Sequence, residues 1–471
     1  MAPTQEPRVK VYSALSDIAG RFHFAPLDEG PAGRLMHRNL VLMALSCLMD
    51  KNHLLVGEPG WGKTTGAKIL AARLTGLPYD LYDAMEIRGN PQKYEEKIVG
   101  RPHYGRLARG EESVVWQGSF GLDVLNIDEA NRLPYDSQDV ILQGIDTGRW
   151  NYQNQSLFEG KKPAFLTMNE RTGNHENGLL PALKDRLDIV TEEAFFSTMV
   201  IFDFHAAKEA REKELCRPDF TSSAVSSLGL GYDKFKAALK KRPVEGHLTE
   251  DERKAIREQI ASLEFDNDAM LFLQAFMAEI NYSAQYGTKR ASDPASQDTH
   301  DQMYAGVSVR HSFSPRSVMA AMDYARGLAW FMGGSPGLDH VRYVLPHVFA
   351  HKADFSDDYK NKHGNAQRRD SQMLHLAKTL VSEVFLRYTT AIQPMKNLIS
   401  VLQRWEAGER GFAVEDDSSK ELVRDLEAIE KGELKPEDAP ALKADRHDHP
   451  LMKDLVANAR EMDRKAFYEE S

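Results

Sequence analysis

The chain has 471 residues, 42% of them hydrophobic, which is enough for two or three domains with buried cores, and its formal net charge is −10. This charge argues against a protein that coats nucleic acid, although a basic channel inside an acidic assembly would be compatible with it. The chain has two cysteines, so we expect neither a disulfide framework nor a zinc site. The N-terminus lacks the apolar core of a signal peptide, and no apolar run approaches the roughly 18 residues of a membrane span. We therefore expect a cytoplasmic protein without a membrane span.

The first predicted elements are a helix, a strand and a second helix. Apolar residues recur at helical spacing through residues 34–49, residues 53–56 form a short apolar run, and helical spacing returns in residues 63–74. Between the strand and the second helix lies GEPGWGKTTG, residues 57–66, which fits the pattern G-x-x-x-x-G-K-[ST]. Its glycines would let backbone N–H groups close around phosphate oxygens at the N-terminus of the second helix.

This loop predicts an ATP site with a bound Mg²⁺ ion. Lys63 would contact the β- and γ-phosphates, and the hydroxyl of Thr64 would bind the metal. A chance match in a glycine-containing turn is the alternative, and the strand and helix on either side argue against it. The predicted nucleotide-binding residues are Gly57, Glu58, Pro59, Gly60, Trp61, Gly62, Lys63, Thr64 and Thr65.

Two adjacent acids end the next apolar run, residues 122–127. The interval after the phosphate-binding loop leaves room for one more strand and an insert. At the carboxyl end of a strand, Asp128 would hold the Mg²⁺ shell and Glu129 would take a proton from the attacking water. Two acids after a strand are often only a solvated strand end, but the loop before them favours the catalytic interpretation.

An asparagine and an arginine follow in the order that an ATPase needs. A helical stretch at residues 136–145 and a hairpin lead to another buried strand, which ends at Asn169, whose amide could orient the lytic water. Arg186 ends a short helix before a last strand and could reach the nucleotide site of a neighbouring subunit. The alternatives are a capping amide and a surface salt bridge. Alternating strands and helices predict a parallel sheet with helices on both faces.

The second half of the chain, from about residue 197, reads as helices. Residues 287–300 resemble a polar linker, and the charge-rich tail contains two further loop or linker segments, EDDSSK at 415–420 and residues 431–450. His447 and His449 fall in the last of these, and two histidines in an exposed linker are seldom a metal site, so we assign them none.

Taken together, residues 35–350 resemble the AAA+ ATPases, and within them the MoxR-type subgroup related to the magnesium-chelatase ATPase subunit. GEPGWGKTT resembles the family's P-loop, NIDEANRLPYDSQDVILQGIDTGRW its Walker B segment, TMNE its sensor 1 at Asn169, and LKDRLDIV its arginine-finger segment at Arg186. FSPRSVMAAMDYARGLAW resembles the sensor 2 helix of the lid, with Arg316 as the sensor arginine acting on its own nucleotide or on a neighbour's. The resemblance implies an α/β core at 35–197 and a helical lid at 198–350. Residues 1–34 are then an N-terminal segment, and the charge-rich, helical pattern of residues 351–471 predicts a C-terminal extension that the resemblance does not cover.

The resemblance also interprets two stretches inside the core as substrate-contacting inserts near the pore or one face of a ring. One is residues 86–120, and the other is the hairpin at 148–163. The first carries basic residues among glycines and aromatics, but acids interleave with them, so an ordinary solvated surface is the alternative. These basic residues are Arg88, Lys93, Lys97, Arg101, Arg106 and Arg109.

Two classes of function remain open. The favoured one is an ATP-driven ring, with six subunits expected, that remodels or matures a partner protein, since MoxR relatives act on partners that often bear a von Willebrand factor A domain and sometimes insert metal cofactors. The alternative is a nucleic-acid motor, because helicases of the same clade share these inserts. A nucleotide switch that does not hydrolyse ATP is disfavoured by Glu129.

Overall fold

The structure is a computed structural model, in which the chain folds into two compact units. The first unit comprises Met1–Asp266, Ser314–Lys352 and Arg368–Leu374, and the second comprises Asn267–Phe313, Ala353–Gln367 and His375–Ser471. The domain limits inferred above from the sequence stay a prediction. The described residues are 7–22, 27–110, 112–169, 178–193, 202–283, 287–289, 303–310, 313–364, 371–443, 447 and 449–469.

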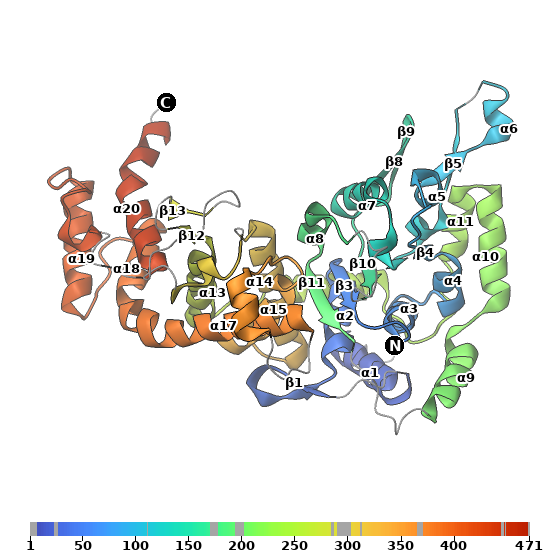
Figure 1. The fold of residues 1–471 in the computed structure, drawn as a ribbon, viewed down its shortest axis with the longest axis horizontal. Helices are drawn as coiled ribbons and strands as arrows, with labels where there is room; N and C mark the ends of the chain where they lie inside the picture. Colours follow the sequence, from blue (N-terminus) through green and yellow to red (C-terminus); the bar gives the residue numbers. More distant parts are fainter. Residues whose placement is uncertain are drawn as a thin grey trace. The chain divides into compact units, whose positions relative to one another are not determined.

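A five-stranded parallel sheet with the order β11-β3-β10-β7-β4 forms the centre of unit 1 (Figure 1). Every residue of β3 and β11 is buried, as expected for strands of a parallel sheet covered by helices. The order brings the carboxyl ends of β3, β10 and β7 next to one another, and the P-loop, Asn169 and Glu129 follow these three strands. The strands are β3 (Asn52–Val56), β4 (Ile87–Arg88), β7 (Leu125–Asp128), β10 (Ala164–Met168) and β11 (Ile189–Glu192).

Helices α2 and α3 pack on this sheet, α2 against β3 and β11 and α3 against β7 and β10. Helix α3 begins where the P-loop ends, because Gly62 has a left-handed backbone with φ 83° and Lys63 is the first helical residue. The helical spacing predicted for this stretch is confirmed by its buried face of Ala67, Leu70, Ala71 and Leu74. The helices of this core are α2 (Arg38–Leu48), α3 (Lys63–Thr75), α4 (Tyr79–Ala84), α7 (Tyr135–Thr147) and α8 (Pro181–Arg186).

The predicted insert between β4 and β7 contains a projecting segment, residues 95–116, which we call the arm. In the arm, β5 pairs antiparallel with β6, and Figure 1 shows α6 at its outer end. The predicted hairpin is confirmed as β8 and β9, and it reaches the arm where the Asn154 side chain donates a hydrogen bond to Glu112 at 3.3 Å. These elements are α5 (Glu95–Ile98), β5 (Gly100–Pro102), α6 (Tyr104–Leu107), β6 (Val114–Trp116), β8 (Arg149–Tyr152) and β9 (Gln155–Phe158).

The remainder of unit 1 is mainly helical, which confirms the predicted change of pattern after the sheet. Helix α15 and His351, two residues beyond its end, cover the free edge of β11. His347 donates to the carbonyl oxygen of Val190 at 3.0 Å, and His351 donates to that of Leu187 at 2.8 Å. The helices are α1 (Pro7–Arg21), α9 (Asp203–Leu215), α10 (Pro218–Leu230), α11 (Tyr232–Leu239), α12 (Glu250–Ala261), α14 (Pro315–Met332) and α15 (Leu338–Phe349).

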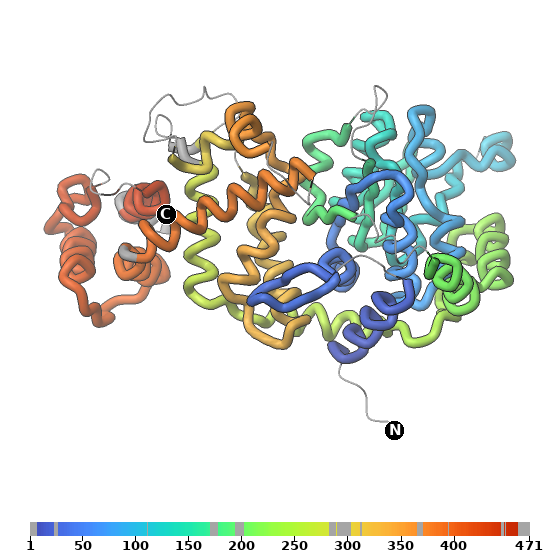
Figure 2. The backbone as a smooth tube through the Cα atoms, turned by 60° about the horizontal axis from the view of Figure 1, so that its bottom comes forward, coloured from blue at the N-terminus to red at the C-terminus, as the bar shows by residue number. Residues whose placement is uncertain are grey.

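Unit 2 is formed mostly by helices, and α18 packs against α20. Figure 2 draws the C-terminal helices of the chain in orange and red. The predicted helical tail is confirmed. The loop predicted at residues 415–420 is wrong in part, because the Asp416 side chain accepts a hydrogen bond from the Ser419 N–H and starts α19 there. The predicted linker at 287–300 lies mostly outside the described residues. The helices are α13 (Asn267–Asn281), α16 (Asp357–His363), α17 (Gln372–Arg387), α18 (Lys396–Glu406), α19 (Asp417–Glu430) and α20 (Pro450–Glu469), with α17 beginning in unit 1.

The expected exposure of the tail histidines is wrong. His447 and His449 are buried, with 9% and 2% of their surfaces exposed. His449 contacts Glu279 at 3.2 Å, and Arg387 forms an ion pair with the same carboxylate at 2.6 Å. Glu279 is completely buried, so these contacts satisfy a charge that would be costly without partners. The histidine pair therefore belongs to the packing of unit 2.

Candidate nucleotide and catalytic site

The P-loop of unit 1 has the backbone expected of a phosphate-binding turn. Gly57, Gly60 and Gly62 all have positive φ, at 154°, 84° and 83°, a region that residues with a Cβ rarely adopt. Pro59, Gly60 and Gly62 are exposed, whereas Glu58 and Trp61 are half-buried. The exposed turn at the N-terminus of α3 can thus present backbone N–H groups to an anion.

Lys63 lies buried beneath this turn, with 6% of its surface exposed. Its ammonium group donates to the carbonyl oxygens of Gly57 and Glu58 at 2.6 and 2.9 Å, and to Asn169 Oδ1 at 2.9 Å. Burial lowers the pKa of Lys63, and nearby carboxylates, first among them Asp128, oppose that shift. A phosphate can replace these neutral oxygens as the partner of the ammonium group, so the site fits a nucleotide.

Thr64 and Asp128 lie together, although they come from α3 and β7. The Thr64 hydroxyl donates to Asp128 Oδ1 at 2.6 Å, and Thr167 in β10 donates to the same oxygen at 2.6 Å. A hydroxyl and a carboxylate are ligands of the kind that Mg²⁺ accepts while it keeps water and phosphate oxygens as its other ligands. Thr65 is half-buried next to them. This pair therefore fits the predicted metal site.

Glu129 directly follows β7 and turns toward Asn169. Asn169 Nδ2 donates to Glu129 Oε1 at 3.2 Å, and Arg132 Nη1 donates to Glu129 Oε2 at 2.5 Å. Lys63, Asn169 and Glu129 thus form a continuous chain of contacts at the carboxyl edge of the sheet. When ATP and Mg²⁺ are bound, the metal would supply charge stabilisation at the phosphates, while Glu129 and Asn169 would orient and deprotonate a water.

Arg186 and Arg316 lie close to each other, at the end of α8 and the start of α14. Both form ion pairs with Asp146 at the end of α7 and with Asp185, at N···O distances between 3.3 and 3.8 Å. Among the residues that the structure describes, neither arginine contacts the P-loop, Asp128 or Glu129. The described residues therefore form two clusters, one around the P-loop and one that contains both arginines.

Three residues of the first cluster were not identified from the sequence. Arg132 and Thr167 contact the predicted acids directly. Thr167 could have been identified from the sequence, because it is a polar residue two positions before Asn169 and therefore lies on the same face of the strand. Glu193 follows β11, where its backbone and Cβ lie within 3.4 Å of a Cβ placed at Gly57. Burial raises the pKa of Glu193 to about 7, whereas Asn39, Arg38 and Lys63 oppose that shift.

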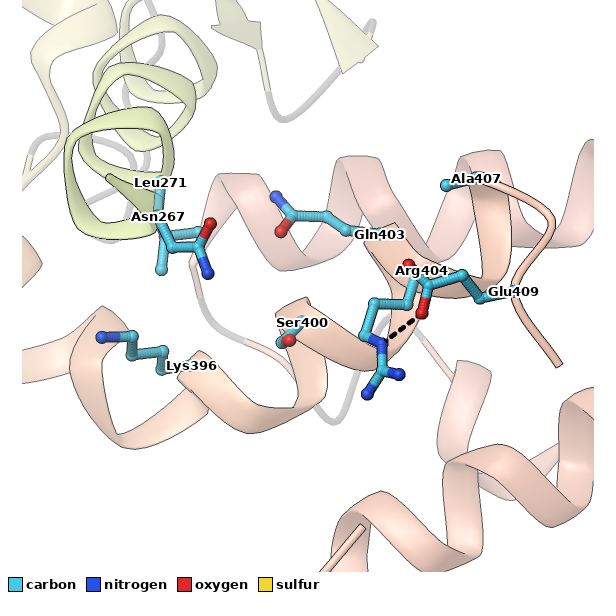
Figure 3. Close-up of a pocket in the computed structure, with 8 residues that line it drawn as sticks. All are labelled: Asn267, Leu271, Lys396, Ser400, Gln403, Arg404, Ala407 and Glu409. Carbon is cyan, nitrogen blue, oxygen red and sulfur yellow. Dashed lines mark hydrogen bonds and ion pairs between the residues drawn. The ribbon is translucent and has the colours of Figure 1, made fainter. Parts of the chain in front are cut away.

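A separate cavity lies in unit 2 and contains none of the predicted site residues. It has a volume of about 510 Å³ and lies beside α13 and α18 (Figure 3). Its two cations are already neutralised, Lys396 by Asp268 and Arg404 by Glu409 at 2.7 Å. We therefore assign it no part in nucleotide chemistry.

Part of this core matches a known family of domains. Residues 52–187 match the family of the AAA domain (dynein-related subfamily), a range that contains the P-loop, Asp128, Glu129 and Asn169. The parallel sheet and flanking helices have the AAA+ ATPase fold predicted from the sequence.

A solved structure supports the fold over most of the chain. It is a 2.00 Å crystal structure of a candidate ATPase from Cytophaga hutchinsonii, with 13% sequence identity and a TM-score of 0.53, and the match covers 81% of this chain and 96% of that one. Comparison with curated proteins gives no match. Among the helices of the described ranges, none combines the length and apolar character needed to cross a bilayer.

Proposed function

We propose that the protein hydrolyses ATP in the presence of Mg²⁺. The observation that carries the proposal is the convergence of Lys63, Thr64, Asp128 and Glu129 at one edge of the sheet, with Thr64 and Asp128 only 2.6 Å apart. Lys63 would bind the phosphates, and Thr64 and Asp128 would bind the metal. Glu129 would deprotonate the attacking water. Asn169, which contacts both Lys63 and Glu129, would orient that water.

We propose further that the active form is a ring, with six subunits expected, in which Arg186 and Arg316 act on a neighbour's nucleotide. The support is that both arginines contact Asp146 and Asp185 rather than the P-loop cluster of their own subunit. Arginines at a subunit boundary can neutralise the charge that develops on the transferred phosphoryl group. Because the two lie together, the proposal assigns both to the same neighbouring site.

The work that hydrolysis drives is, in this proposal, the remodelling or maturation of a partner protein, as in MoxR-type ATPases. Tyr104 and Leu107 at the end of the arm are exposed by 64% and 47%, and Arg106 is exposed beside them. An apolar and cationic tip of this kind can contact an acidic or partly unfolded protein segment. A partner with a von Willebrand factor A domain follows from the resemblance alone, and nucleic acid is the alternative ligand of the same tip.

The test measures phosphate release with and without Mg²⁺ over a range of protein concentrations, with the oligomer mass measured in parallel. The proposal expects metal-dependent turnover whose rate per subunit rises as rings form. A Lys63→Ala control should lose nucleotide binding. Full activity in a monomer would contradict the ring, and absence of Lys63-dependent ATP binding would contradict the ATPase assignment.

A further inference from the structure

The cavity in unit 2 is lined by two cations on one side of α18. Lys396, Ser400 and Arg404 follow one another at intervals of four residues, which places them on the same side of the helix (Figure 3). Lys396 and Arg404 are just over two turns apart, or about 12 Å along the helix axis. This spacing suits a ligand that carries two separate anionic groups rather than one small anion.

The guanidinium of Arg404 is held in place but keeps most of its hydrogen-bond donors. Its Nε donates to Glu409 at 2.7 Å, and its Cζ lies over the ring of Phe412, 4.0 Å from the ring centroid. Figure 3 shows the end that carries the two Nη atoms directed away from Glu409. Within the described ranges, these two nitrogens have no hydrogen-bond acceptor. Because paired Nη groups can bind a carboxylate through two parallel hydrogen bonds, Arg404 is preorganised for a second carboxylate.

The ammonium group of Lys396 also keeps donors that its ion pair does not use. It contacts Asp268, which leaves two of its three N–H groups for other acceptors. The side chains of Lys396 and Arg404 are 39% and 41% exposed. Solvent-exposed ion pairs of this kind contribute little to stability, so a carboxylate from another molecule can share either cation at small cost.

Uncharged polar groups of the cavity can bind a peptide main chain between the two cations. Ser400 and Asn267 line the cavity, and neither side chain has a hydrogen-bond partner among the residues that the structure describes. Gln403 donates to Gln274 at 2.5 Å and thereby connects α18 to α13. In an extended peptide, side chains four positions apart lie on the same side and about 13 Å from each other, which is close to the spacing of the cations.

We propose that this cavity binds an extended acidic segment of a partner protein, with two carboxylates four residues apart on Lys396 and Arg404. The Nη groups of Arg404 hold one carboxylate and the ammonium of Lys396 holds the other. Nucleic acid fits less well, because Asp268 and Glu409 would repel a backbone that carries a charge at every phosphate. The inference goes beyond ATP hydrolysis and does not depend on it, since no P-loop residue lines the cavity.

The test is the fluorescence anisotropy of a labelled peptide titrated with the full chain at low ionic strength. The probe peptide carries two glutamates four positions apart among serines and glycines. We expect saturable binding that Lys396→Met and Arg404→Met each weaken about fivefold or more, because each removes one charge-assisted contact. Lys420→Met and Arg310→Met are the matched controls, since each removes an exposed, ion-paired cation of unit 2 outside the cavity. Both should change the affinity by less than about twofold.

Two further probes test the charge and the spacing of the ligand. A peptide with glutamines in place of the glutamates should bind at least about tenfold more weakly, because amides lose both charge-assisted contacts. A peptide with the two glutamates adjacent should also bind more weakly, since its carboxylates cannot reach both cations. Lys63→Ala should bind the acidic probe like wild type, so failure of the ATPase assignment leaves this inference standing.

Several results would overturn the proposal. They are an acidic probe that does not bind, a glutamine or adjacent-glutamate probe that binds equally well, and wild-type affinity in both cavity variants. Single-stranded DNA that binds more tightly than the probe and is lost in the same two variants would assign the cavity to a phosphate backbone instead. Thermal unfolding of each variant should match wild type, which excludes a loss of folded protein as the cause.

Discussion

Arg186 and Arg316, from helices far apart in the sequence, contact the same carboxylate, with Asp146 lying 3.5 Å from the first and 3.3 Å from the second. In the P-loop cluster, Lys63 and Glu129 contact other residues and neither of these two arginines. Two arginines at one place are expected to act on one anion, and a carboxylate between them can hold them until that anion arrives. The sequence alone left open whether Arg316 acts on its own nucleotide or a neighbour's, and this contact favours the neighbour's.

Replacing either arginine should therefore impair hydrolysis without weakening ATP binding. We expect Arg186→Ala and Arg316→Ala each to lower kcat by about 100-fold or more, because both would stabilise the transferring phosphoryl group. Fluorescent-nucleotide binding and phosphate release measure the two quantities separately. Mixing either variant with wild type should reduce activity more than dilution does. An Arg316→Ala protein that loses ATP binding as a dispersed monomer would place Arg316 at its own subunit's site.

The arm provides a second prediction. Replacing Arg101, Tyr104 and Arg106 with alanine should leave basal ATPase within about twofold of wild type, since the arm lies apart from the P-loop contacts. The same change should abolish stimulation by a protein client, measured by adding the client to an ATPase assay. Lys254→Ala on α12, an exposed residue outside both inserts, is a control for loss of one surface charge. A triple variant that responds to every partner like wild type would return the arm to an ordinary solvated surface.

Nucleic acid is the competing ligand of the arm. If its arginines contact phosphates, binding should weaken with salt so that log K falls by roughly 0.7 to 0.9 for each phosphate contacted per unit of log salt. We expect a protein client instead, because acids such as Glu95, Glu96 and Glu112 interleave with the basic residues. Strong stimulation of ATPase by DNA or RNA, lost at high salt and in the triple variant, would reverse that expectation.

Glu193 should make the stability of unit 1 depend on pH. Its pKa of about 7 in the folded chain exceeds the ordinary value of 4.5, so the folded state binds more protons than the unfolded state between these values. Stability is therefore lost as pH rises from about 4.5 through about 7. Glu193→Gln, which keeps the shape without the charge, should raise the unfolding free energy at pH 8 by on the order of 1 to 3 kcal/mol and change it little at pH 5. Equal effects at both pH values, in thermal or denaturant unfolding, would contradict the assignment.

Glu279 should be essential for the stability of unit 2. Glu279→Ala would leave the buried ends of Arg387 and His449 without their acceptor, so we expect a loss of about 3 kcal/mol in denaturant unfolding. Glu279→Gln keeps acceptor oxygens and should cost less. ATP binding should persist in both variants, because the P-loop contacts lie in unit 1. A loss below about 1 kcal/mol for the alanine variant would show that the cluster contributes little.

The core of unit 1 could be predicted from the sequence because its signals are local. Buried apolar runs, helical spacing and the glycines around Lys63 are properties of short segments, and the carboxyl ends of parallel strands necessarily share one edge of the sheet. That rule alone places Asp128 and Asn169 near the P-loop. Their roles in ATP chemistry stay a prediction.

The remaining contacts depend on long-range packing and could not be read from spacing. Nothing near Asp146 indicates that it would contact two arginines, one of them 170 positions away. His449 looked like part of an exposed linker because HDHP is polar, yet a carboxylate on α13 holds it in the interior. Glu193 gained its raised pKa from burial beside Gly57, which depends on the register of β11 against β3.

The assignment of the base at Glu129 is tested most directly by Glu129→Gln, compared with Lys63→Ala in one set of assays. The account predicts that the Gln variant binds Mg-ATP within a few fold of wild type and hydrolyses it at least about 100-fold more slowly, because the glutamate acts on the water and not on ground-state phosphates. Lys63→Ala should lose binding itself. Normal hydrolysis by Glu129→Gln would contradict the account, since another group would then have to deprotonate the water.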